Sequence, residues 1–210
     1  MQRVLLGRHA LAPEYSASDI STSFRANGTI NPDTAEYNEH VRTGFADWQL
    51  SVSGLVEYPL RLSLADLRRL PSRTQITRHD CVEGWSCIAK WSGARLSALL
   101  QQAHLKPNAR YIAFYCADSL EPGPDDSGQY YETIDMIDAL HPQTILAYDM
   151  NGRPLTVRHG APLRLRVERQ LGYKMAKYVM RIEAIESFAN LARGKGGYWE
   201  DRGYQWYAGI

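Results

Sequence analysis

The sequence predicts an α+β protein in which mixed β-sheets carry short helices. Apolar and polar residues alternate along several short segments, which is typical of strands with one buried face. The helical spacing of apolar residues is confined to brief stretches between these segments. The chain of 210 residues contains no internal repeat, no low-complexity tract and no linker between two cores, so a single domain is expected.

The two ends of the chain differ in character. Residues 1–44 are polar and rich in turn formers, so we expect an extended N-terminal arm that wraps around the body. The body, residues 45–210, begins with a strand predicted within 47–56, where Trp48, Leu50 and Val52 alternate and Gly54 ends the strand. Ser63, with Asp66 three residues later, then predicts the capped start of a short helix over 63–71.

The remaining elements follow from the same two periodicities. In order, we predict a strand over 73–82, a helix over 93–105, a strand over 109–117, an acidic surface loop over 118–129, a brief helix over 135–142, a hairpin over 144–157 that turns at Asn151-Gly152, and two strands within 163–185.

Composition excludes several classes of protein. A net charge of +1 gives no overall field for nucleic acid, and no run of apolar residues is long enough to span a membrane. The start "MQRVLLGRHALAPEY" has too short an apolar run for a complete signal peptide and is compatible with the remnant of a trimmed leader. The three cysteines form no zinc-type pair and predict no disulfide scaffold, although a Cys87–Cys116 bond stays open.

Basic residues are concentrated in one segment. Between Arg153 and Arg181 the only acid is Glu168, and the segment holds eight Lys and Arg: Arg153, Arg158, Arg164, Arg166, Arg169, Lys174, Lys177 and Arg181. Such a segment in a neutral protein indicates either a local anionic ligand or a solvated strand face. The sequence alone leaves both interpretations open.

Cys81 allows three interpretations on local grounds. A lone cysteine at the end of a strand is commonly a small buried hydrophobe. His79, two residues earlier on the same strand face, offers a base for a nucleophile. A thiolate is also a soft ligand for a metal ion.

The stretch "CVEGWSCIAKWSG", residues 81–93, resembles the cysteine loop of the sulfite oxidase family of molybdenum oxidoreductases, and most closely its periplasmic methionine sulfoxide reductase branch. Further landmarks follow the family's order along the chain: Asn38 in "YNEH", Cys116 in "YIAFYCAD", His159 and Arg164 in "HGAPLR", Met175, Ala176 and Lys177 in "GYKMAKYVMRI", and Tyr204 in "YWEDRGY".

This resemblance implies a sulfite oxidase-like fold that holds one molybdenum–molybdopterin per chain. It implies that Cys81 ligates the metal and that Glu83 and Tyr204 join it as catalytic residues, with His79 a further candidate for proton delivery. The cofactor contacts it implies are Asn38, Cys81, Cys116, His159, Arg164, Met175, Ala176 and Lys177. Cys116 and His159 replace a threonine and an asparagine of the reductase branch.

Substrate and partners are also expected from the resemblance. Sulfite oxidases carry sulfite-binding arginines just after their cysteine, whereas the next cation here is Lys90, so we expect oxygen-atom transfer on a small S- or N-oxide. Sulfite dehydrogenase with cytochrome c as acceptor is the alternative, and a cofactor-free binding module a remote one. Because no haem or flavin motif is visible, the expected electron partner is a separate cytochrome of b or c type. The family implies a periplasmic location.

Overall fold

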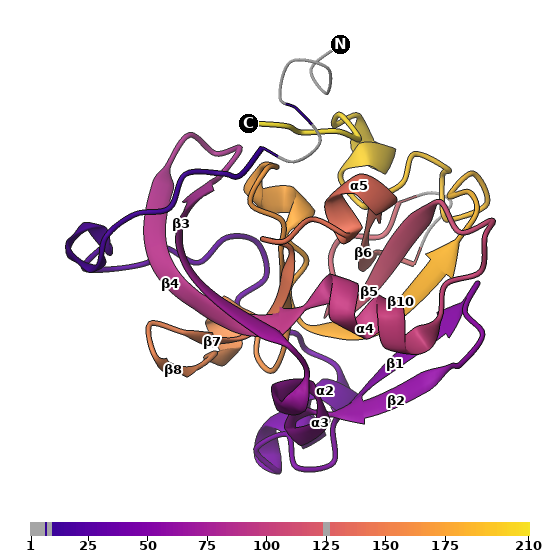
Figure 1. Ribbon diagram of the computed structural model, residues 1–210, viewed down its shortest axis with the longest axis horizontal. Helices are drawn as coiled ribbons and strands as arrows, with labels where there is room; N and C mark the ends of the chain where they lie inside the picture. The colour runs from indigo at the N-terminus through magenta and orange to yellow at the C-terminus, as the bar shows by residue number, and fades with distance from the viewer. Residues whose placement is uncertain (1–6, 8–9, 124–126) are drawn as a thin grey trace.

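Two β-sheets form the body of the computed structural model, which describes residues 7, 10–123 and 127–210. The first sheet has the strand order β2 (Leu60–Ser63), β1 (Gln49–Gly54), β10 (Val179–Ile185), β5 (Tyr111–Ser119) and β6 (Gln129–Asp135). The second has the order β3 (Ser72–Asp80), β4 (Ser86–Arg95), β7 (Ile145–Met150) and β8 (Arg153–Pro154), with β9 (Arg164–Arg166) paired to β7. The two sheets lie side by side in Figure 1.

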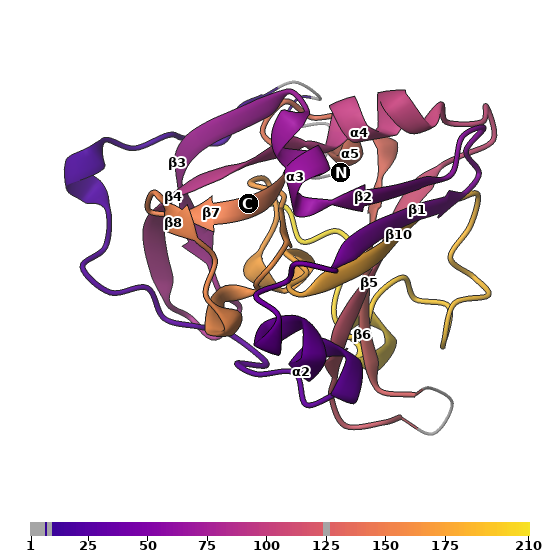
Figure 2. The ribbon, with the colours of Figure 1, turned by 90° about the horizontal axis from the view of Figure 1, so that it is seen from below.

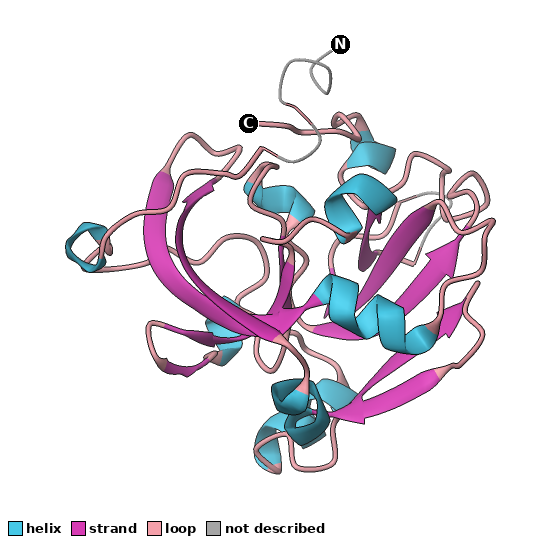
Figure 3. Cartoon of the chain, in the orientation of Figure 1, coloured by secondary structure: helices cyan, strands magenta, loops and turns pink. Residues whose placement is uncertain are grey.

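The helices are short and scattered, as Figure 3 shows. The α-helices are α2 (Ala35–Arg42), α3 (Leu64–Arg69), α4 (Leu96–Ala103) and α5 (Met136–Ala139), and the 3-10 turns are η1 (Ala17–Asp19), η2 (Val157–His159), η3 (Gly172–Lys174) and η4 (Glu200–Arg202). The predicted α+β class with mixed sheets is therefore confirmed. Within the described residues no helix combines the length and apolar character that crossing a bilayer requires.

Alternating side chains build the main core. On β1, Leu50 and Val52 are buried, and they pack in one cluster with Phe114 of β5 and Ile182 of β10. Strand β1 pairs in parallel with β10, although some 130 residues separate them, and the other strand pairs are antiparallel. The N-terminal and C-terminal parts of the body are thus joined in one sheet.

The hairpin of β3 and β4 carries Cys81 at its turn. The chain reverses over 81–85, where the Cys81 N–H donates to the Trp85 carbonyl at 2.9 Å and Gly84 takes a φ of 86°. Gly93 lets β4 approach β7 closely, because a Cβ there would lie 2.2 Å from the Leu146 carbonyl oxygen. The tight turn over 81–85 and the close packing at Gly93 together fix the position of the hairpin turn relative to the body.

Several sequence predictions hold. Ser63 and Asp66 form the expected capping box of α3, and Asn151 and Gly152, both with positive φ, form the turn of the β7–β8 hairpin. The strands predicted over 47–56, 73–82 and 109–117 are present as β1, β3 and β5. Strands β2 and β6 were not predicted.

Other predictions are corrected. The helix expected over 93–105 begins only at Leu96, because β4 continues to Arg95 as the partner of β7. The acidic segment 118–129 is not wholly a surface loop: β5 extends through Ser119, and Asp118 is buried. Residues 124–126 of that segment lie outside the described residues.

The N-terminal arm is extended only in part. Residues 1–6 and 8–9 lie outside the described residues, and 10–34 run along the β3–β4 hairpin with η1 as their one regular turn (Figure 2). The Tyr15 N–H donates to the Ile76 carbonyl, and the Ser21 N–H donates to the Ile88 carbonyl. Contrary to the prediction, 35–42 form the helix α2, which Thr34 caps by accepting from the Tyr37 N–H at 3.2 Å.

Candidate active site

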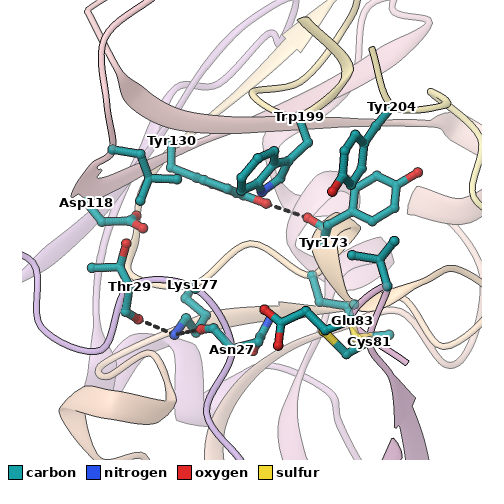
Figure 4. Close-up of a pocket in the computed structure, with 15 residues that line it drawn as sticks. Asn27, Thr29, Cys81, Glu83, Asp118, Tyr130, Tyr173, Lys177, Trp199 and Tyr204 are labelled. Carbon is teal, nitrogen blue, oxygen red and sulfur yellow. Dashed lines mark hydrogen bonds between the residues drawn. The ribbon is translucent and has the colours of Figure 1, made fainter. Parts of the chain in front are cut away.

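A pocket opens beside the turn of the β3–β4 hairpin. It is lined by the arm (Asn27, Gly28, Thr29), the hairpin turn (Cys81, Val82, Glu83), β5, β6 and the loop between them (Asp118, Leu120, Tyr130), and the C-terminal segments (Gly172, Tyr173, Met175, Lys177, Trp199, Tyr204). Five predicted site residues meet here from distant parts of the chain: Cys81, Glu83, Met175, Lys177 and Tyr204 (Figure 4).

The Cys81 thiol enters the pocket at the hairpin turn and is nearly buried. Burial raises the pKa of this thiol, although the Glu83 backbone N–H opposes the shift, and a raised pKa opposes a free nucleophilic thiolate. Among the described residues no group of three or more His, Cys, Asp and Glu is placed to hold a metal ion.

Glu83 lies next to Cys81 at the exposed side of the pocket. Its carboxylate accepts from the Trp85 Nε1–H at 2.9 Å, and Arg25 of the arm lies 3.7 Å away. The Arg25 guanidinium also lies over the Trp85 ring, 5.4 Å from its centroid. Glu83 is thus held by two neighbours while about half of its side chain stays exposed.

An aromatic wall faces Cys81 and Glu83 (Figure 4). The Trp199 and Tyr204 rings stack with centroids 5.3 Å apart, and Tyr173 meets Tyr204 edge-on at 5.2 Å. The Tyr130 hydroxyl donates to the Tyr173 carbonyl at 2.6 Å, which joins β6 to the C-terminal part of the wall. Apolar groups of a small ligand would contact this wall.

A buried charge cluster lies next to the aromatic wall in the chain. The Lys174 ammonium donates to Glu200 at 2.6 Å and also to Glu132, and all three side chains are almost fully buried. Lys174 lies between Tyr173 and Met175 in the chain, and Glu200 follows Trp199. The three charged residues do not line the pocket themselves, but they hold in place the neighbouring residues that do.

Lys177 is held by the arm. Its ammonium donates to the backbone carbonyls of Asn27, at 2.6 Å, and of Thr29 and Arg158. Burial, and then the charge of Arg164, lower the pKa of Lys177 to about 7. Neutral carbonyls satisfy its hydrogen bonds, and the Asp118 carboxylate offsets its charge only in part.

Arg164 is a second buried cation without a carboxylate partner among the described residues. It is 1% exposed and donates to the His159 carbonyl at 3.1 Å, and its Nε and Nη2 have no partner within residues 7, 10–123 and 127–210. Burial, and then Arg166, lower the pKa of Arg164 to about 9. Arg166 differs because Glu168 accepts from it at 2.6 Å and 2.9 Å. Burying a cation without a carboxylate partner costs free energy, so Arg164 and Lys177 together indicate an anionic ligand.

His79 belongs to the same buried group. Arg166 donates to its Nδ1 at 3.0 Å, so the ring proton of the neutral imidazole is on Nε2, which has no partner. Burial, and then Arg166, hold the pKa of His79 well below its usual range. Its Nε2 faces Gly172, where a Cβ would lie 2.4 Å away. In this tautomer neither ring nitrogen has a free lone pair, which disfavours His79 as a base for Cys81.

Other predicted site residues lie outside the pocket lining. Asn38 is exposed on α2, and its amide donates to Asp33 at 3.4 Å. Cys116 and Ala176 are buried in the main core. His159 shares its Nε2–H with the Phe24 carbonyl at 3.1 Å, and the Phe24 ring packs against the rings of His79, Trp91 and His159.

The structure also adds residues that sequence reasoning missed. Asn27 and Thr29 lie in the polar arm, Asp118 in the presumed surface loop, and Tyr130 on an unpredicted strand. None of them carries a local signal in the sequence. Tyr173 and Trp199 do, since they belong to the "GYKMAK" and "YWEDRGY" landmarks. All three cysteines are free, so the Cys87–Cys116 bond is absent.

Comparison with known proteins agrees with this geometry. Residues 38–190 match the family described as "Oxidoreductase molybdopterin binding domain". A putative protein-methionine-sulfoxide reductase subunit YedZ1 from Azospira oryzae is 38% identical over 209 residues, which span 100% of this chain and 72% of that protein. The protein-methionine-sulfoxide reductase catalytic subunit MsrP from Ralstonia nicotianae is 36% identical over 170 residues, 78% of this chain and 51% of that one.

A solved structure shares the architecture. The sulfane dehydrogenase SoxCD from Paracoccus pantotrophus aligns with a TM-score of 0.59 and 26% identity, over 67% of this chain and 39% of that chain. The sulfite oxidase-like fold expected from the sequence is thereby confirmed.

Proposed function

Because this chain belongs to the oxidoreductase molybdopterin binding domain family, we propose that it transfers an oxygen atom from a small S-oxide, in the reducing direction. The observation that carries this proposal is the pocket itself, which the Cys81 thiol and the buried Lys177 ammonium both line. The chain is a molybdopterin-dependent oxidoreductase; its substrate, direction and partner are proposals.

The residues present fit molybdopterin. Arg164, with two nitrogens unpartnered among the described residues, and Lys177, whose charge Asp118 offsets only in part, supply the cations that a phosphate and a dithiolene require. The unpartnered His79 Nε2–H adds a neutral donor. Cys81 would hold the metal, and when bound the cofactor supplies the two-electron chemistry. We propose one such group per chain.

The chain's own residues would bind the substrate and supply protons. Reduction of a sulfoxide consumes two electrons and two protons and releases water. Glu83 and Tyr204 are the proton-carrying side chains that line the outer part of the pocket, and Tyr173, Trp199 and Tyr204 form a surface suited to the carbon and sulfur atoms of a sulfoxide.

Charge at the pocket favours a neutral substrate over sulfite. Glu83 places a carboxylate beside Cys81, while Arg25 is engaged by Glu83 and Trp85 and Lys177 by the arm. The Glu83 carboxylate would therefore repel an anionic substrate such as sulfite, while the nearby cations are engaged by other groups. Oxidation of a sulfur compound, with sulfite as the case to test, remains the rival, because a sulfane dehydrogenase shares the fold.

Two assays distinguish S-oxide reduction from sulfite oxidation. We expect turnover of methionine sulfoxide with a reduced viologen dye and little turnover of sulfite with cytochrome c; robust sulfite oxidation alone would reverse the assignment. As the electron source in the cell we propose a separate cytochrome of b or c type, in the periplasm. Fractionation and partner reconstitution test both points.

Elemental analysis tests the cofactor. Protein from a molybdenum-sufficient host should contain about one molybdenum per chain. Cys81→Ser should remove a sulfur ligand in X-ray absorption and abolish turnover, whereas Cys87→Ser, which changes a cysteine outside the pocket, should do neither. Wild-type protein without metal and pterin would refute the proposal.

A further inference from the structure

Residues 20–30 of the arm, which we call the strap, cover one side of the pocket without joining a sheet or an α-helix. Asn27 and Thr29 of the strap line the pocket (Figure 4). Among the described residues, the only backbone-to-backbone hydrogen bond from the strap to the body runs from the Ser21 N–H to the Ile88 carbonyl, at 3.0 Å. A segment with so few backbone bonds opens at a lower free-energy cost than the strands it lies on.

Side chains of the body hold the strap at two points. At one point the Lys177 ammonium donates to the Asn27 carbonyl at 2.6 Å and to the Thr29 carbonyl. At the other point the His159 ring donates to the Phe24 carbonyl at 3.1 Å. Because each of these bonds joins a side chain to the backbone of the strap, both points can be released without breaking a strand pair.

The strap also covers donors that have no partner. The Phe24 ring lies 5.7 Å from the His79 ring and 5.4 Å from the Trp91 ring, and Arg164 lies over Trp91 at 5.0 Å. His79 and Arg164 are at most 1% exposed, and both carry nitrogens without a partner among the described residues. A ligand from solvent reaches these nitrogens only after a covering segment moves. His79, Trp91 and Arg164 lie on sheet strands, whereas the strap can move while both sheets stay intact.

We propose that the strap is the gate for the cofactor: it opens to admit the pterin with its phosphate and then closes over the bound group, held by Phe24 and Lys177. The inference rests on the proposed function, because it takes molybdopterin as the ligand that enters. Asn27 and Thr29 line the pocket only while the strap is closed, so closure also completes the pocket wall. A ligand bound under the closed strap stabilises the closed state by linkage.

Limited proteolysis tests this linkage. Arg25 is exposed in the strap, and trypsin cleavage after it follows the population of the open strap when opening and closing are fast. We expect cleavage after Arg25 to be at least about tenfold slower in cofactor-loaded protein than in protein from a host that cannot make the pterin. Cleavage after Arg69, an exposed residue at the end of α3 and outside the pocket, should differ by less than about twofold. Equal rates after Arg25, or equal slowing at both sites, would overturn the inference.

A reversible cross-link tests entry directly. The Cys87 thiol on β4 lies 3.9 Å from the Ser23 carbonyl oxygen, so Ser23→Cys places a second thiol beside it. Oxidation of the cofactor-free variant bridges the strap to β4, and the loss of two thiols verifies the bridge. Molybdopterin released from another enzyme is then added, and bound pterin is measured as its fluorescent oxidised form.

We expect the bridged protein to take up pterin at least about tenfold more slowly than wild type, and reduction of the bridge to restore uptake. The matched control combines Ser23→Cys with Cys87→Ser, which cannot form the bridge, and should take up pterin at the wild-type rate under the same oxidant. Fast uptake by the bridged protein would overturn the inference and indicate entry past another segment, such as the hairpin turn over 81–85. Wild-type protein that never binds pterin would instead refute the proposed function.

Discussion

Lys174 offers the sharpest test of how charge is arranged behind the pocket. Its ammonium is fully buried between Glu132 and Glu200, and Oε2 of each carboxylate has no partner within the described residues. Lys174→Met keeps the volume but leaves two buried carboxylates without a cation. Breaking a buried ion pair in this way costs about 3–5 kcal/mol. For a chain of this size, that loss lowers the melting temperature by roughly 6–20 °C.

The pH dependence of this loss has a definite sign. Burial, and then the Glu200 charge, raise the pKa of Glu132 well above its usual range, and Lys174 opposes the shift. Without Lys174 the pKa rises further. A carboxyl whose folded pKa is raised stabilises the fold below its unfolded pKa, about 4.3, and loses that contribution as pH rises through the folded pKa. The deficit of Lys174→Met should therefore grow with pH.

Thermal and urea unfolding of cofactor-free protein across that range measure the effect. Glu132→Gln keeps an acceptor for Lys174 and removes the repulsion between the carboxylates, so we expect a change within about 1 kcal/mol. Arg153→Met, an exposed cation of the same basic segment, should change stability by no more than about 0.5 kcal/mol. A Lys174→Met deficit that is below about 1 kcal/mol, or independent of pH, would refute the reasoning.

Two further predictions concern the arm. Because the pKa of Lys177 is lowered to about 7, the unfolded chain holds an extra proton between about pH 7 and about pH 10, so unfolding free energy should rise with pH there. Lys177→Met should remove that slope in urea unfolding, and an unchanged slope would contradict the assignment. Phe24→Ala should weaken the attachment of the arm to the body by about 1–2 kcal/mol. Trypsin cleavage after Arg25 should then become about 5- to 30-fold faster. Leu11→Ala, at an exposed position, should leave that rate unchanged. Equal cleavage rates in both variants would contradict the inference that the Phe24 ring holds the arm against the body.

Local chemistry made much of this protein predictable. The Ser63–Asp66 cap and the Asn151-Gly152 turn were predicted because neighbouring residues alone determine them. The order of the landmarks from Asn38 to Tyr204 indicated the family, and five of the predicted site residues line one pocket. The sequence left two interpretations of the basic segment open, a local anionic ligand or a solvated strand face. Five of its cations are buried, which argues against the solvated face: Arg164, Arg166, Arg169, Lys174 and Lys177.

Other features depend on which distant segments meet. Asp118 looks like part of an acidic loop until β5 pairs with β10 and the arm covers it. Likewise, the sequence cannot tell that Glu168 neutralises Arg166 while Arg164 has no such partner, because both arginines lie on the same short strand β9.

By itself, therefore, the sequence determined the fold class and the family, and it singled out Cys81, which lines the pocket. Only the tertiary structure decided which cations stay uncompensated, how the arm closes over Lys177, and that Asp118 faces the pocket. The physical reason is that periodicity and capping act between neighbours, whereas burial and ion pairing depend on contacts such as the one between Lys177 and Asn27, 150 residues apart.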